Sequence, residues 1–412
     1  MHILYNFFIH LYVLLLHCLA LFNDKVKTML KGESQCFGVL RKIPRNKKVI
    51  WFHCASLGEF EQGRPLIEKM KETYPQYGIL LSFYSPSGYE IRKNYSFADW
   101  VVYLPNDTKR NAEKFVSLSN PSIVFFIKYE FWYNYIRALK GRRLFQVSLI
   151  LRPSQYFFKP YGKWFVRQLS HFEYFFVQDE QTMSLLNSKG FENVCITGDT
   201  RFDRVAGIAK QAKRFPLIET FCQTDKKIIL AGSTWEPDEK ILAKVFDKMD
   251  FKLIIAPHLI NNSHISFIKS LFEDSVLYSE QDESNPADKK VLVIDCIGIL
   301  SSLYQYCDIA YIGGGFGEGI HNTLEAATFG NPVFFGPNYH KFKEAVELIE
   351  RGAAFSIKNE EELQNGLRQL LNNADLYRES AQSSKQYVEE NLGACERITA
   401  YIDTYQCHED KQ

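Results

Sequence analysis

The chain alternates short apolar runs with longer amphipathic ones, and this alternation constrains its fold more than any other feature. From Lys48 onward the apolar runs are rich in β-branched and aromatic residues, which favour strands. Strands that are apolar throughout and are separated by helices are typical of a parallel sheet covered on both faces. The pattern therefore predicts an α/β chain of the doubly wound kind.

The expected strands form two series. The first series comprises residues 49–53, 79–83, 101–104, 123–127, 144–148, 174–177 and 194–197. The second comprises residues 228–231, 253–256, 291–295, 309–312, 333–335 and 355–357. Expected helices include residues 59–73, 109–118 and 180–189, and a helical tail over 359–405.

The two series predict two domains, because 412 residues exceed what one core usually supports. We expect an N-terminal anchor helix in residues 1–24, a first domain in 25–205 and a second in 226–412, with the more polar segment 206–225, which contains Pro216, as the linker. Two such domains in tandem would leave a cleft at the carboxyl ends of their sheets, where ligands bind.

Composition excludes several classes of protein. A hydrophobic content of 46% and a charged content of 24% mark a folded chain, and the net charge of +1 gives no bulk field for nucleic acid. The 9 cysteines are scattered, with no C-x-x-C pair, which favours a reducing cytoplasm over a disulfide framework or a zinc site. No His/Asp/Glu spacing resembles a metal triad, so we expect neither a metal nor another cofactor.

The N-terminus carries an almost uncharged apolar run from Ile3 to Phe22, about as long as a bilayer core is thick. It lacks the basic start and the small-residue cleavage site of a signal peptide. Its polar residues Asn6, His10 and His17 lie on one helix face, which suits a span with one packed side, an interfacial helix or a buried core helix. The basic residues that follow favour a cytoplasmic location for the rest of the chain, beside anionic lipid.

A glycine cluster follows the expected strand 309–312. Five glycines fall within the seven residues Gly313 to Gly319, without a G-x-G-x-x-G spacing or a following G-K-[ST]. A dinucleotide fingerprint and a P-loop are therefore disfavoured. A glycine turn before a helix lets the backbone approach a ligand, and a helix N-terminus favours an anion. Glu325 is then either a partner for sugar hydroxyls or a capping carboxylate.

Charged residues follow two strands of the first series. Glu59 lies at the start of the helix after strand 49–53, placed either to take a proton from a hydroxyl or to cap the helix. Glu130 comes directly after strand 123–127. Arg201 follows the last strand and can neutralise a phosphate or carboxylate.

Small and polar residues end two strands of the second series. Ser233 and Thr234 form a turn of the kind that contacts phosphate, although an ordinary helix cap has the same sequence. Pro257 and His258 follow the next strand, where the imidazole either meets a ligand or merely begins a helix.

Taken together, these motifs resemble one family. Phe52 to Glu59, Tyr129-Glu130-Phe131-Trp132, Gly198 to Asp203, Ala256-Pro257-His258, Gly313 to Glu325 and Pro332 to Pro337 occur in the order seen in the 3-deoxy-D-manno-octulosonic acid (Kdo) transferases. The resemblance covers nearly the whole chain, including the N-terminal anchor. It implies a GT-B glycosyltransferase, with two Rossmann-like domains facing a cleft.

The resemblance also implies an activity and a set of site residues. The family transfers Kdo from CMP-Kdo to the lipid A precursor lipid IVA at the cytoplasmic side of the bacterial inner membrane, with inversion, in lipopolysaccharide biosynthesis. Glu59 matches the general base, while Glu130 and Arg201 match residues that support the transition state. The residues that match the CMP-Kdo site are Pro257, His258, Gly313, Gly314, Gly315, Asn322, Thr323, Leu324 and Glu325.

Two departures from the family pattern are visible. Lys128 stands where the family commonly has a carboxylate, which puts the geometry around Glu130 in question, and Arg201 stands where lysine is frequent. An alternative is another GT-B transferase that uses a UDP-sugar at the inner membrane, which would share the glycine loop but would not require the Glu59 motif.

Overall fold

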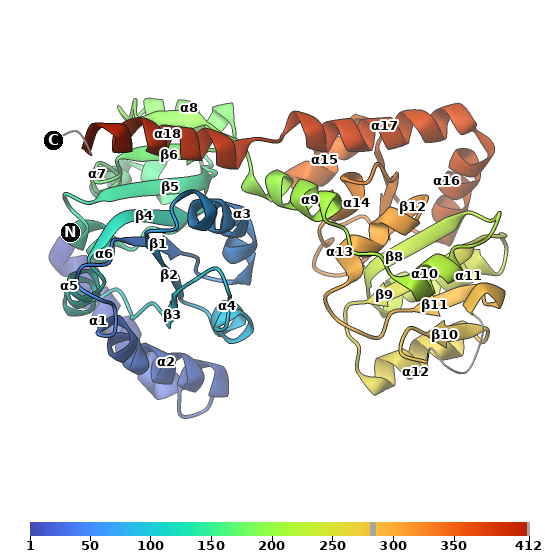
Figure 1. Cartoon of the computed structure of the whole chain (residues 1–412), viewed down its shortest axis with the longest axis horizontal. Coiled ribbons are helices and arrows are strands. Elements are labelled where there is room, and N and C mark those ends of the chain that lie inside the picture. Colours follow the sequence, from blue (N-terminus) through green and yellow to red (C-terminus); the bar gives the residue numbers. More distant parts are fainter. Residues whose placement is uncertain (281–285, 410–412) are drawn as a thin grey trace. The chain divides into compact units, whose positions relative to one another are not determined.

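The computed structural model describes residues 1–280 and 286–409 and divides the chain into two compact units (Figure 1). Unit 1 comprises Met1–Asp203 and Gly393–Gln412, and unit 2 comprises Arg204–Leu392. Each unit contains one parallel sheet of seven strands. The predicted α/β class, with two doubly wound sheets, is confirmed.

Unit 1 is built on the strand order β3-β2-β1-β4-β5-β6-β7. Its strands are β1 (Val49–His53), β2 (Gly78–Phe83), β3 (Trp100–Tyr103), β4 (Pro121–Ile127), β5 (Arg143–Leu149), β6 (Tyr174–Val177) and β7 (Val194–Ile196). Its helices are α1 (His2–Leu19), α2 (Asp24–Leu40), α3 (Leu57–Thr73), α4 (Pro86–Arg92), α5 (Lys109–Ser119), α6 (Tyr133–Ala138), α7 (Lys163–Leu169), α8 (Glu180–Asn187) and α18 (Ala394–Glu409). All seven strands expected in this half are present.

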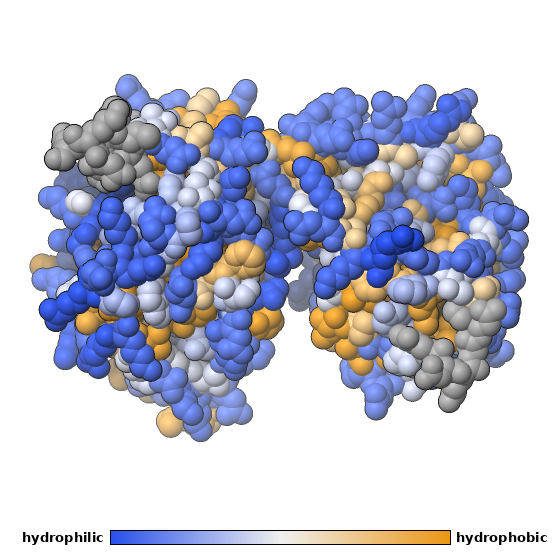
Figure 2. Space-filling model, in the orientation of Figure 1, coloured by the Kyte–Doolittle hydropathy of each residue, from blue (hydrophilic) through white to orange (hydrophobic). Residues whose placement is uncertain are grey.

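The central strand β1 shows why these apolar runs form a sheet covered on both faces. Val49 and Trp51 belong to a core cluster built with α2, α5, α6, α7 and α8, whereas Ile50 and Phe52 belong to a second cluster built with α3 and α18. Alternate side chains point to opposite faces, and each buried apolar side chain contributes about 1.5–3 kcal/mol. Hydrophilic side chains cover much of the outer surface drawn in Figure 2.

Unit 2 repeats the arrangement with the order β10-β11-β9-β8-β12-β13-β14. Its strands are β8 (Ile228–Thr234), β9 (Lys252–Pro257), β10 (Ser275–Leu277), β11 (Val291–Val293), β12 (Ile309–Ile312), β13 (Val333–Phe335) and β14 (Ala354–Ser356). Its helices are α10 (Pro216–Phe221), α11 (Glu236–Phe246), α12 (Asn262–Leu271), α13 (Leu300–Leu303), α14 (Leu324–Ala327), α15 (Lys343–Glu350), α16 (Glu360–Asn372) and α17 (Ala374–Glu390). The sequence missed β10, an edge strand of three residues.

The segments between the two units differ in form from a polar linker. Helix α9 (Thr200–Lys210) contains the boundary at Asp203, and α10 lies within the segment 206–225. The chain returns at Gly393, so that α18 belongs to unit 1, where Figure 1 shows it beside β6. Part of the second domain expected from the sequence, residues 281–285 and 410–412, lies outside the described residues.

The N-terminal helix α1 is packed along one side only. Leu16 is its one buried residue, and Tyr5 packs against the core of unit 1. Most of its large apolar side chains are exposed, including Ile3, Phe7 and Leu14. A buried core helix, one of the three interpretations of this segment, is therefore excluded.

Asp203 holds the returning chain in unit 1. Its carboxylate accepts hydrogen bonds from the amides of Gly393, at 2.6 Å, and Cys395, at 2.7 Å. Arg397, one turn later, donates to the carbonyl oxygen of Thr197. Free amides at the start of a helix require such acceptors, so Asp203 acts as the cap of α18.

Replacing Asp203 by alanine should loosen the start of α18. Loss of a helix cap costs about 1–2 kcal/mol, so the amides of residues 393–397 should lose protection in hydrogen exchange while those of β1 keep theirs. Asp375→Ala is the matched control, because its pair with Arg378 is largely exposed and contributes little. Unchanged protection of residues 393–397 in Asp203→Ala would show that the apolar face of α18 suffices.

Candidate active site

Several of the residues expected in the site lie at the points where the strand order reverses, whereas Arg201 follows the edge strand β7 and His258 follows β9. In unit 1 this point falls between β1 and β4, and in unit 2 between β8 and β12. Helices leave such neighbouring strands in opposite directions, and the opening at the strands' carboxyl ends is where α/β sheets bind ligands. Glu59 and Glu130 follow β1 and β4, while Thr234 and Gly313 lie at the ends of β8 and β12.

Glu59 caps the helix that carries it. Its Oε2 accepts hydrogen bonds from the Ser56 amide, at 3.0 Å, and from the Ser56 hydroxyl. This is a capping box, in which the third helical residue reaches back to the cap. The carboxylate is half-buried. The capping role considered from the sequence is therefore present, and it constrains the rotamer of Glu59.

Glu130 lies in a kinked segment directly after β4. Lys128 has a φ of 69°, which is uncommon outside glycine and turns the chain sharply at this point. The Trp132 indole N–H donates to Glu130 Oε2, and His53 Nε2 lies 3.3 Å from the same oxygen without the alignment of a hydrogen bond. Both Glu130 and His53 are buried. The carboxylate is therefore held in one orientation against the end of β1.

Several side chains of unit 1 near this edge interact electrostatically. Burial raises the pKa of the Cys54 thiol, and the charges of Glu59 and Glu130 add to this effect. Burial likewise raises the pKa of the Tyr129 hydroxyl, which feels Arg201 and Glu59 among its neighbouring charges. Both carboxylates are therefore near enough to act on the Cys54 thiol, and the Tyr129 hydroxyl is influenced by Arg152 and Asp179 as well as by Arg201 and Glu59.

The Arg201 side chain is oriented by Asp199, two residues earlier in the chain. Its Nε donates to Asp199 Oδ2 at 2.8 Å, and its backbone amide donates to Asp199 Oδ1. Gln62, buried on α3, donates to the same Asp199, while its carbonyl oxygen accepts from the Thr200 hydroxyl. The helix that carries Glu59 and the turn that carries Arg201 are therefore tied together by one glutamine.

In unit 2 the end of β8 is held in place by hydrogen bonds to neighbouring side chains and backbone groups. Ser233 adopts a φ of 54°, and the next hydroxyl, on Thr234, donates to Glu239 Oε1 at 2.8 Å. His264 Nε2 lies 2.9 Å from the same oxygen. The Thr234 carbonyl accepts the amide of His258. Ser233 and Thr234, which were expected in a turn, are the last two residues of β8, where a β-bulge interrupts the pairing with β9, and these bonds place them beside Pro257 and His258 at the carboxyl edge.

Asp238 fastens the glycine loop to this edge. Its carboxylate accepts hydrogen bonds from the amides of Gly314 and Trp235 and from the Tyr311 hydroxyl, at 2.8–3.0 Å. Burial raises the pKa of Asp238, and these donors oppose the rise. One buried carboxylate therefore joins the start of α11 to the loop that follows β12.

The glycines themselves are required by backbone packing within the protein. A Cβ at Gly313 would lie 2.3 Å from the carbonyl oxygen of Ser233, and one at Gly315 would lie 2.6 Å from the Gly336 backbone. Gly314 has a φ of 91°. The sequence interpretation had assigned the glycine cluster to the approach of a ligand. The structure gives these three glycines an additional role, since they allow three strand ends to meet.

The helix after the loop is short. α14 begins at Leu324 and contains only 4 residues, and a turn with Gly330 at φ 78° follows. Its dipole is correspondingly small, so the sequence argument for anion binding at this helix N-terminus is weakened. The Asn322 side chain accepts from the Leu324 amide and donates to Glu325. Burial raises the pKa of Glu325, and Arg204 opposes this rise.

A stack of three rings lies at the same edge. His258 stacks on Trp235 and on His321, with centroid separations of 4.6 Å in both pairs. The Trp235 indole N–H donates to His321 Nε2, so neutral His321 carries its proton on Nδ1. Burial and the neighbouring His258 lower the pKa of His321 to about 4. His321 is therefore uncharged at neutral pH.

Sequence reasoning overlooked several of these residues as members of the site. His53, Asp199 and Asp238 are buried polar side chains at strand or helix ends, a placement that a strand assignment could have flagged. Trp132 stands in a motif quoted from the sequence but was given no role of its own there, whereas Trp235 gave no signal, because its role depends on a bond across the fold to His321.

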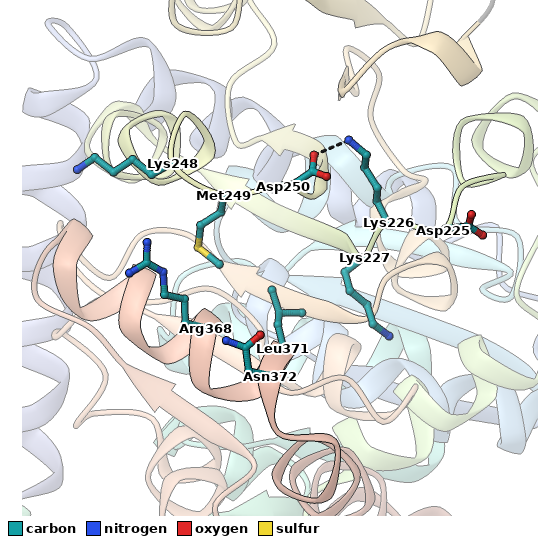
Figure 3. Close-up of a pocket in the computed structure, with 9 residues that line it drawn as sticks. All are labelled: Asp225, Lys226, Lys227, Lys248, Met249, Asp250, Arg368, Leu371 and Asn372. Carbon is teal, nitrogen blue, oxygen red and sulfur yellow. Dashed lines mark hydrogen bonds and ion pairs between the residues drawn. The ribbon is translucent and has the colours of Figure 1, made fainter.

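A pocket elsewhere in unit 2 is separate from this edge. It is lined by Lys226, Lys248, Asp250 and Arg368, among others, and Lys226 pairs with Asp250 (Figure 3). Lys226 and Asp250 immediately precede β8 and β9, so the pocket lies at the amino ends of these strands. The Gly313 loop lies at their opposite end.

Two glycine substitutions should show whether Gly313 is needed for close backbone packing or only for a flexible loop. Gly313→Ala should lower the melting temperature by several degrees, because overpacking costs about 1–3 kcal/mol. Gly317→Ala is the control, since that residue is exposed and a Cβ there would lie no closer than 3.6 Å to the Gly314 carbonyl oxygen. Equal melting temperatures for the two variants would contradict the packing role of Gly313.

His321 should make stability depend on pH. Its folded pKa of about 4 lies below the ordinary value of 6.5, so the folded state binds fewer protons and loses stability as the pH falls from 6.5 towards 4. His321→Asn removes this loss. At pH 7.5 the variant should melt at a lower temperature than the wild type. The difference between the two melting temperatures should then shrink as the pH is lowered to 4.5. A deficit that is constant or grows would refute the lowered pKa.

Comparison with known proteins shows the family and the fold of the chain. Residues 32–204 match the family described as 3-Deoxy-D-manno-octulosonic-acid transferase (kdotransferase). Solved structures with a similar fold include a UDP-GlcNAc 2-epimerase from Neisseria meningitidis, with a TM-score of 0.61 and 17% identity over 87% of this chain and 100% of that one. A glycosyltransferase from Rickettsia africae has a TM-score of 0.55 and 14% identity over 87% and 98%. At such identities these likenesses concern the fold, which is GT-B-like as predicted.

Relatives of known sequence are more specific. The 3-deoxy-D-manno-octulosonic acid transferase of Aquifex aeolicus is 30% identical over 335 residues, which cover 79% of this chain and 86% of the relative. That of Rickettsia bellii is 25% identical over 394 residues, covering 92% and 91%. The similarity thus extends across both units. The chain belongs to the family of 3-deoxy-D-manno-octulosonic acid (Kdo) transferases and is a glycosyltransferase.

Proposed function

We propose that this Kdo transferase takes Kdo from CMP-Kdo and attaches it to a lipid A precursor, lipid IVA, at the cytoplasmic face of the inner membrane. The observation that carries this proposal is the pair of carboxylates at the β1/β4 reversal. Glu59 and Glu130 lie together at the carboxyl edge of unit 1, and each is held by a defined hydrogen bond. A sugar hydroxyl requires such a base when it attacks a sugar-nucleotide.

In the proposed step a single bond exchange occurs. The acceptor hydroxyl oxygen attacks the anomeric carbon of Kdo, the bond from that carbon to the phosphate oxygen breaks, and CMP departs. The hydroxyl proton passes to Glu59. Arg201, oriented by Asp199, offsets negative charge on the departing phosphate, and Glu130 supports the positive charge that develops at the sugar. Direct attack gives inversion.

Unit 2 is proposed to hold the nucleotide. The bulged end of β8 at Ser233 and the Gly313 loop carry backbone groups at one edge, beside the ring stack that contains His258. The Thr323 hydroxyl is buried and has no hydrogen-bond partner in the described part of the chain, so it is available to a ligand. Glu325 and Asn322, which are already bonded to each other, offer acceptors and donors for a ribose.

Helix α1 is proposed to bind the membrane. His2–Leu19 is long and apolar enough to cross a bilayer by length and composition. However, contacts to unit 1 extend from Tyr5 to Leu16, along most of its length. A helix docked in this way presents its exposed apolar face to lipid while the rest of unit 1 remains in water. We therefore favour a helix that lies in the interface rather than one that spans the bilayer.

The test is a transfer assay with CMP-Kdo and lipid IVA, in which products are weighed by mass spectrometry. Wild type should add Kdo. Glu59→Gln should lower kcat by about 10²–10⁴-fold, because glutamine at this helix position can still cap α3 but cannot accept a proton. Binding of CMP should be unchanged. The substitution therefore separates the base from the cap, which is the alternative role of Glu59.

Glu72→Gln, an exposed carboxylate on the same helix, is the matched control and should keep full activity. Full activity in Glu59→Gln would assign Glu59 to capping alone. Inhibition by UDP but not by CMP would instead support a UDP-sugar transferase. Binding of CMP-Kdo without transfer to lipid IVA would retain the donor and reject the acceptor.

A further inference from the structure

The helix that faces the membrane is joined to unit 1 by polar side chains as well as by apolar packing. The Tyr5 hydroxyl donates to Asp107 Oδ2 at 2.5 Å, and the Asn134 amide group donates to Asn6 at 2.9 Å. The Tyr12 hydroxyl lies 3.0 Å from that of Tyr84. Attachment to lipid requires only an exposed apolar face, so these polar contacts have a role other than attachment.

Asp107 connects Tyr5 to the start of α6. Its carboxylate accepts the backbone amides of Asn134, at 3.1 Å, and Tyr135, at 3.2 Å. These are the second and third residues of α6, and the residue before the helix, Trp132, makes no side-chain cap. Asp107 therefore caps α6 from another loop and fixes where this helix begins.

The cap depends on its donors because Asp107 is buried, with 2% of its surface exposed. Burial raises the pKa of this carboxyl to about 7, while the Tyr5 hydroxyl and the amides of α6 lower it. Loss of the Tyr5 donor therefore favours the protonated acid, which is a poorer acceptor for the α6 amides. The hydroxyl on α1 thus stabilises the ionised cap.

A second link runs through aromatic rings. Tyr84, which contacts Tyr12, packs against Trp132 with a centroid separation of 4.6 Å. Trp132 is the residue before α6, and its indole donates to Glu130. The first link thus ends at Asn134 and Tyr135 in the first turn of α6, and the second ends at Trp132, the residue directly before that helix.

We propose that Tyr5 and Asp107 are positioning residues for Glu130, so that the docked helix α1 supports the active site as well as the attachment to lipid. The proposal rests on the proposed function in so far as Glu130 takes part in transfer. The coupling of α1 to the Trp132 indole is independent of the reaction. A substitution on α1 therefore has two separate readouts.

The experiment uses Tyr5→Phe in the full-length protein, in detergent, with dispersed lipid IVA and CMP-Kdo. Removing one hydroxyl should lower kcat about three- to tenfold, the range of one hydrogen bond, with the KM for CMP-Kdo unchanged. In protein labelled with 5-fluorotryptophan, the ¹⁹F resonance of Trp132, assigned among the five tryptophans by substitution, should shift. Sedimentation with anionic phospholipid vesicles should remain at the wild-type level, because the exposed apolar face is intact.

Tyr161→Phe is the matched control, since Tyr161 is 66% exposed in the same unit, and it should change neither kcat nor the Trp132 resonance. An unmoved Trp132 resonance in Tyr5→Phe would overturn the proposal, whatever happens to the rate. So would a lower vesicle affinity with unchanged kcat, because α1 would then act only in attachment. If wild type transfers no Kdo but the Trp132 resonance still moves in Tyr5→Phe, the coupling stands and the proposed function fails.

Discussion

Burial of a parallel sheet on both faces is the constraint on which the rest of this structure depends. β1 divides its side chains between two core clusters, so helices must cover both faces and functional groups can emerge only at the strand ends. At the carboxyl ends, reversal of the strand order separates the covering helices. Glu59, Glu130, Ser233 and Gly313 emerge at the two reversals, and this placement follows from topology.

Much of the fold could be predicted because its strands are uniformly apolar. The sequence located β1, β6, β12 and β13 to the residue, since each is bounded by polar or turn-forming residues. It missed β10, where three residues provide no periodicity. It also placed the C-terminal helices in the second domain, whereas α18 belongs to unit 1. Bonds from Asp203 to Gly393 and Cys395 determine that return, and contacts between residues 190 positions apart leave no local pattern.

The sequence predicted where the candidate site residues lie in the fold, but not the contacts that hold them there. Charged residues that follow apolar runs led to the prediction of Glu59 and Glu130 as site residues, and the structure places both after strands of the first sheet. Composition could not show that Gly313 and Gly315 are required by the neighbouring Ser233 and Gly336 backbones. The strained φ values of Lys128 and Ser233 were equally invisible, because neither residue type signals a left-handed conformation. The side chain of Lys128 departs from the family pattern, but its backbone still makes the sharp turn after β4.

Carboxylates that are buried, or partly buried as at Asp203, do the same physical task at several places. Asp107, Asp203 and Asp238 each accept backbone amides from a segment distant in sequence, and so fix where a helix or loop begins. Desolvation penalises the charged form of Asp107 and Asp238, so the ionised carboxylate at each position depends on the hydrogen bonds that it accepts. At Asp107 one donor comes from α1, whose large apolar side chains are mostly exposed. A helix held in this way has a defined register on its domain, which an apolar face alone would not impose, and Asp107 connects that register to the start of α6, directly after the segment from Glu130 to Trp132.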